Sequence, residues 1–146
     1  MTTGRWIVIL TTALIAGGVA WLLKLVAIAV LVVTGSPDIE SGLVAFFYLT
    51  GFALLVIGST ALGLWLTRSR PAPLRIAAVI LSPLLFWFSF ELLDTIADSI
   101  VGDQAPNYVQ SETAILLAAL GWLAIGVMVR KSTRSTPHRP RYLIAK

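Results

Sequence analysis

The sequence predicts an all-α integral membrane protein in which four helices cross the bilayer as an up-down bundle. Apolar residues make up 58% of the 146 residues, charged residues make up 12%, and the mean hydropathy is +0.90. Soluble domains carry about 25% charged residues. The apolar residues lie in four long segments. The stretches that flank these segments are in turn basic and acidic along the chain. A water-soluble fold of this length could not bury so much apolar surface, so we expect lipid to cover much of it.

The four predicted spans are residues 6–33, 43–66, 74–97 and 112–129, within a transmembrane domain over residues 1–130. Crossing the hydrocarbon takes about 20 helical residues. The first span is longer than this, so it must tilt or begin with a turn in the interface. These runs lack the alternation of barrel strands, which favours helices.

Turn-forming residues separate the spans. Thr34-Gly35-Ser36-Pro37 closes the first span, and the segment 68–73, which contains two prolines, separates the second from the third. Residues 102–110 separate the third from the fourth. Ser111 followed by Glu112 is typical of a helix start, with a hydroxyl cap and a first-turn carboxylate.

The charges predict the orientation of the bundle. Cytoplasmic loops retain Lys and Arg, so the side rich in basic residues is expected to be inside. On that side, the two terminal segments and residues 68–75 carry ten basic residues and no acidic one. They are Arg5, Arg68, Arg70, Arg75, Arg130, Lys131, Arg134, Arg139, Arg141 and Lys146. The loops on the other side carry acidic residues and no basic one. We therefore expect both termini to be cytoplasmic and the protein to lie in the plasma membrane.

A few ionisable residues lie within the spans and form the candidate polar cluster: Lys24, Glu91 and Asp94, with Asp98 at the edge. The three carboxylates are spaced i, i+3, i+7 and so share one helix face, which Ile80, Leu84 and Trp87 continue. Lys24 lies on a stripe of small residues, so we expect it to point into the bundle. Counted along the helices at about 1.5 Å per residue, Lys24 and Glu91 lie at similar depths, so an ion pair between them is a hypothesis.

A structural role for this cluster, as an ion pair or interfacial anchor, is the commoner reason for such residues. The alternative is a pathway for protons or cations. The hypothesis of a divalent metal site has less support, because hard cations take six or more oxygen ligands and one helix face supplies too few. The chain has no cysteine and one histidine, His138, and we expect neither a metal nor a cofactor.

Small residues predict where the helices pack closely. They are Gly51 and Gly58 in the second span and Ala118 with Gly121 in the fourth. The Gly17-Gly18 pair fits either close packing or a kink, and packing is the commoner reason.

Residues 131–146 form a basic tail, expected to lie in the cytoplasm. Attraction to anionic lipid is worth about 1 kcal/mol for each basic residue near the surface. The expected headgroup or partner contacts are Arg130, Lys131, Arg134, Arg139 and Arg141. Nucleic-acid binding is not expected, because Tyr142 is the sole aromatic residue among these charges.

The sequence contains no phosphate-binding Gly-rich loop, no Ser/His/Asp set and no zinc-binding His-Glu-x-x-His helix, so we do not expect an enzyme. Two function classes remain. We expect an accessory or assembly subunit that packs against a larger membrane protein or self-associates. The alternative is a small oligomeric transporter or channel that uses Lys24, Glu91 and Asp94.

Overall fold

The computed structural model describes residues 3–35, 42–102 and 107–134. These contain four helices: α1 (Thr3–Val33), α2 (Gly42–Leu66), α3 (Ala72–Val101) and α4 (Asn107–Arg134). No strand occurs in the described residues. Each helix contains one predicted span and is long and apolar enough to cross a membrane. An all-helical membrane protein is therefore supported, and helices suit lipid because they satisfy their own backbone hydrogen bonds.

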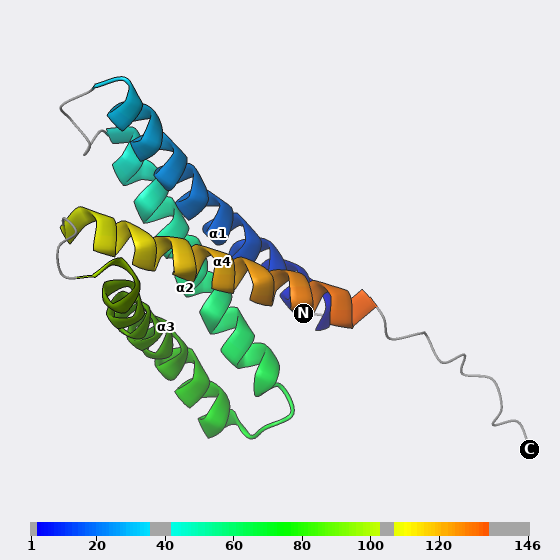
Figure 1. Ribbon diagram of the computed structural model, residues 1–146. Coiled ribbons are helices and arrows are strands. Elements are labelled where there is room, and N and C mark those ends of the chain that lie inside the picture. Colours follow the sequence, from blue (N-terminus) through cyan, green and yellow to red (C-terminus); the bar gives the residue numbers. More distant parts are fainter. Residues whose placement is uncertain (1–2, 36–41, 103–106, 135–146) are drawn as a thin grey trace, which may run out of the picture.

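Successive helices are antiparallel, so the start of α1 and the end of α4 lie at the same end of the molecule (Figure 1). We call this the basic end, because Arg5, Arg68, Arg70 and Arg130 lie at the helix termini there. The opposite end, where α1 meets α2 and α3 meets α4 in sequence, is called the acidic end. Asp98 lies near it.

Backbone geometry explains where α1 and α3 end. Gly35 adopts φ 68° just after α1 and its N–H donates to the carbonyl of Val32, a left-handed cap that favours glycine. Gly102 ends α3 in the same way, with φ 80° and an N–H donating to the carbonyl of Asp98. Pro71 precedes α3, as the predicted break between the second and third spans requires. The predicted start of α4 is wrong, since the helix begins at Asn107 rather than at Ser111.

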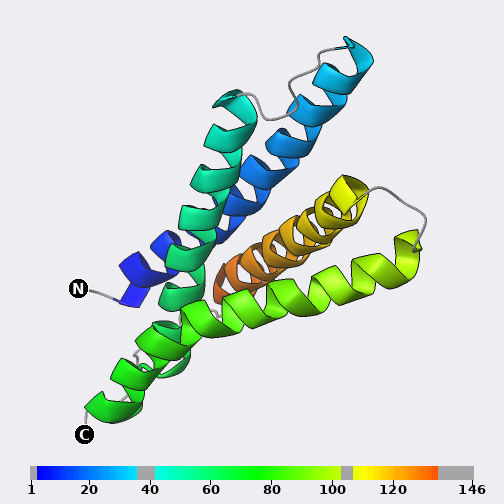
Figure 2. The same ribbon diagram turned by 90° about the vertical axis from the view of Figure 1, so that its left-hand side faces the viewer.

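The first and last helices pack together although they are farthest apart in sequence (Figure 1). α1 packs against α2 and α4, and α3 packs against the same two helices from the diagonal position. Figure 2 shows the α3–α4 hairpin inclined to the α1–α2 hairpin. The core lies among Leu10, Leu14, Trp21, Leu55 and Phe86, each at most 2% exposed.

Glycines allow the close contact of α1 with its two neighbours. A Cβ on Gly51 would collide with the ring of Trp21, and one on Gly58 would lie 2.5 Å from Leu14 Cδ2. Gly17 is as tightly packed against Leu55, and Gly18 against the carbonyl of Ala119, so these two residues serve packing within an unbroken α1. The packing role predicted for Gly121 is wrong, because nothing lies within 4 Å of a Cβ there; Gly126 makes that contact instead.

Candidate functional site

Lys24 of α1 and Glu112 of α4 form an ion pair inside the bundle. Lys24 Nζ lies 2.6 Å from Glu112 Oε1 and 2.7 Å from Oε2, so the ammonium is shared by both carboxylate oxygens. The two side chains are 8% and 22% exposed. At these burials the pair sits mostly out of solvent, where an unpaired charge would be costly.

Small residues on both helices bring the two charges within reach. Lys24 continues the stripe of Ala13, Gly17 and Ala20 along α1, all of which are buried. On α4, Glu112 lies one turn before Ile115 and two turns before Ala119, which are also buried. Gly18 and Ala119 carry little bulk where the two helices touch, so the helix backbones approach closely and a lysine can span the gap.

The ammonium of Lys24 has a second neighbour, the ring of Tyr48 on α2. Nζ lies 5.3 Å from the ring centroid, within the range of a cation–π interaction. Tyr48 is in turn fixed by Trp21: the two rings are parallel with centroids 6.1 Å apart, and the indole N–H donates to the Tyr48 carbonyl at 3.1 Å. Lys24 therefore ties α1 to α2 and α4 together.

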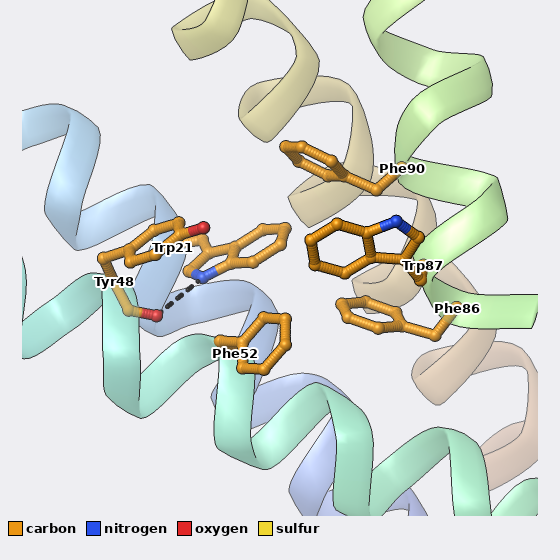
Figure 3. A pocket seen from close by; sticks show the side chains of 6 residues that line it. All are labelled: Trp21, Tyr48, Phe52, Phe86, Trp87 and Phe90. Carbon is orange, nitrogen blue, oxygen red and sulfur yellow. Dashed lines mark hydrogen bonds between the residues drawn. The ribbon is translucent and has the colours of Figure 1, made fainter. Parts of the chain in front are cut away.

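Beside this pair, aromatic side chains of three helices surround a small cavity of about 30 Å³ (Figure 3). Trp21 projects into it from α1, Tyr48 and Phe52 from α2, and Phe86, Trp87 and Phe90 from α3. Aromatic rings line it, and no carboxylate, imidazole or amine is among its lining side chains.

The structure corrects the predicted Lys24–Glu91 pair. The two residues do lie at comparable distances from the acidic end, but α1 and α3 are diagonal in the bundle and meet through the rings of Trp21 and Phe90. The helices adjacent to α1 are α2 and α4, and the counter-ion comes from Glu112 of α4. Depth alone was insufficient, because it does not say which helices are neighbours.

Glu91 and Asp98 are exposed, and Asp94 is half-buried. Glu91, the deepest of the three carboxylates along α3, therefore points away from the bundle interior. Its helix turns the opposite side, including Phe86 and Ala97, toward the core. Residues spaced three or four apart around Glu91 form one exposed stripe, which we call the Glu91 face: Ile80, Leu84, Phe88, Glu91, Thr95 and Asp98.

Glu112 is the site residue that sequence reasoning missed. It was interpreted as a first-turn carboxylate near the surface, because Ser111 resembled a helix cap. The helix begins four residues earlier, so Glu112 lies in its second turn. A usable signal was present: Glu112, Ile115, Ala119 and Gly126 recur at helical spacing, the pattern that pointed Lys24 inward.

The remaining predicted site residues lie at the basic end or outside the described residues. Arg130 and Lys131 are exposed on the last turns of α4. Arg134 is the last residue of α4, while Arg139 and Arg141 lie outside the described residues. Within the described ranges, no three acidic or histidine side chains come together as a metal site would require.

The contacts of Lys24 and Glu112 join three helices of the bundle. The pair carries no net charge when Lys24 is protonated and Glu112 ionised, and the ammonium is held between a carboxylate and a ring. No protein-family model matches the chain, and neither the curated proteins nor the solved structures that were compared with it contain a match.

Proposed function

We propose that this protein is a non-catalytic accessory or assembly subunit of a larger membrane complex. The observation that carries the proposal is the exposure of Glu91 on α3. Glu91 lies seven residues before Asp98, which places it about 10 Å deeper along the helix. A charge near the centre of a membrane helix costs about 2.5–3.5 kcal/mol on insertion scales, and such residues usually face protein or water.

The low burial of α3 supports the same proposal. In the most apolar segment of each helix, 39% of residues are buried in α1, 28% in α2 and 28% in α4, but only 6% in α3. Apolar exposure alone suits any helix in lipid. The combination of a carboxylate with a nearly uncovered helix is what favours a protein neighbour at this position.

The interior of the bundle favours a structural subunit over an enzyme. It is occupied by rings, aliphatic side chains and one ion pair whose two charges satisfy each other. The aromatic cavity is small, and its lining side chains include no carboxylate, imidazole or amine. This arrangement supports a structural role for Lys24 and Glu112. It favours the accessory role over transport, because the ammonium of Lys24 pairs with Glu112 and not with Glu91 or Asp94.

We further propose that the basic end faces the cytoplasm, with both termini inside and the protein in the plasma membrane. The partition of ten basic residues to one side of the spans supports this orientation. The basic side chains at the end of α4 and in the following segment then meet anionic lipid headgroups. These residues are Arg130, Lys131, Arg134, Arg139 and Arg141.

The proposal is tested by purification from the native membrane in mild detergent or nanodiscs, followed by mass analysis of the intact assembly. Stoichiometric recovery of a larger membrane protein is the expected result. Recovery of a homo-oligomer alone would overturn it and favour the transporter or channel. Ion-flux measurements on Glu91→Gln and Lys24→Met in liposomes would then test that alternative.

A further inference from the structure

Resting on the proposed function, we propose that the Glu91 face docks a transmembrane helix of a different membrane protein, and that this helix carries a Lys or Arg side chain at the depth of Glu91. The expected charge of the partner follows from which intramembrane charges in the described residues already have a counter-ion.

The described residues supply no cation for Glu91. Lys24 is the basic residue inside the bundle, and it is buried and pairs with Glu112 at 2.6 Å. Arg75 lies on the same helix as Glu91 but 16 residues away, which is about 24 Å along the axis. An intramembrane carboxylate with no cation in its own bundle is complementary to a basic residue on another helix.

A second copy of this chain does not meet that requirement. Two copies packed through the Glu91 face about a two-fold axis would bring Glu91 close to Glu91, because a two-fold interface uses the same patch on both subunits. The Lys24 of a second copy would be buried in its own bundle and already paired. Like charges at a contact oppose association, so the partner is a different protein.

The shape of the face fits a helix lying along α3. Its residues recur every three or four positions from Ile80 to Asp98, which is about 27 Å of helix. Ile80, Leu84 and Phe88 are 61%, 50% and 67% exposed, so large apolar side chains precede Glu91 along the stripe. The neighbouring Leu85 is equally available at 66%, but it points about 100° away around the helix and lies off the face.

Leu84 and Leu85 provide a matched pair of positions for photo-crosslinking. A photoreactive amino acid is placed at one or the other in the full chain, expressed in the native membrane, and crosslinked peptides are sequenced. The expected result is a heterologous crosslink from position 84 to a transmembrane segment that contains Lys or Arg, at about ten-fold the yield from position 85.

The charge is tested with Glu91→Gln in the same cells. We expect the amount of co-purified partner to fall by about ten-fold or more, since an intramembrane basic side chain is left without its counter-ion. Glu91→Asp should retain partial recovery. Because Glu91 is exposed, the purified variant should elute like the wild type in size-exclusion chromatography, which separates loss of docking from misfolding.

The outcomes separate this inference from the proposed function. A partner that co-purifies but crosslinks from position 85, lacks an intramembrane basic residue or persists in Glu91→Gln overturns the docking face while leaving the accessory role intact. Crosslinks confined to copies of this chain overturn the inference in favour of self-association. If no larger membrane protein co-purifies at all, the proposed function fails and the inference fails with it.

Discussion

Lys24 Nζ and the two carboxylate oxygens of Glu112 lie 2.6 and 2.7 Å apart, joining residues 88 positions apart in the chain. The contact links the first helix to the last. It also gives Lys24, the basic residue inside the bundle, its counter-ion. It therefore both closes the bundle and leaves Glu91 on α3 without an internal counter-ion.

Removing either member of this pair should destabilise the protein. We expect Lys24→Met and Glu112→Gln each to lower the free energy of unfolding by about 1–3 kcal/mol, below the range for fully buried pairs because Glu112 is partly exposed. The double variant should lose less than the sum of the two, since neither charge is then left unpaired. Detergent-induced unfolding of the purified protein measures all three.

Glu91→Gln is the matched control for these variants. Its carboxylate is exposed and contacts no cation among the described residues, so its free energy of unfolding should stay within about 0.5 kcal/mol of wild type. A loss as large as that of Glu112→Gln would contradict the pairing seen here.

Because α1 packs closely on α2, we expect the stability of the protein to depend strongly on the glycines at that contact. Gly51→Ala places a methyl group against the ring of Trp21, and relieving that overlap should cost about 1–3 kcal/mol. Gly121→Ala adds the same group where nothing lies within 4 Å, so it should be neutral or slightly stabilising. Thermal melting in one detergent compares the two. Equal melting temperatures would show that α1 and α2 do not approach as described.

Tryptophan fluorescence can locate α3 relative to lipid. Trp87 is 54% exposed and Trp21 is 1% exposed. In variants that keep one of these and carry phenylalanine at the other four tryptophans, brominated lipid should quench Trp87 strongly and Trp21 weakly. Comparable quenching of both would mean that the aromatic cluster is open to lipid.

The proposed orientation can be tested with single cysteines, because the native chain contains none. Ser69→Cys lies between α2 and α3 at the basic end, and Ser99→Cys lies near the acidic end of α3; both serines are exposed. A membrane-impermeant maleimide added to intact cells should label position 99 and spare position 69. The reverse pattern would invert the topology.

The helices could be predicted from the sequence because lipid imposes a length and a composition on each span. The turns at Gly35 and Pro71 follow from local backbone chemistry in the same way. The inward position of Lys24 followed from the small residues one and two turns away. All of these depend on residues near one another in the chain.

The partner of Lys24 could not be obtained in this manner. Depth along the helices made Glu91 a candidate, but the order of the helices around the bundle places Glu112 beside Lys24. That order depends on contacts between residues far apart in sequence, such as Gly18 with Ala119 and Gly58 with Leu14. Helical periodicity places Glu91 on a face but does not say whether that face points toward the core.

The link between the first and last helices has a consequence for biosynthesis. Helix α1 leaves the ribosome long before α4, so Lys24 enters the bilayer 88 residues ahead of the carboxylate that neutralises it. Until α4 is inserted, the nascent protein holds an uncompensated ammonium at membrane depth. A chain truncated before residue 112 never gains the counter-ion of Lys24, so an unpaired ammonium inside the membrane distinguishes unfinished molecules from finished ones.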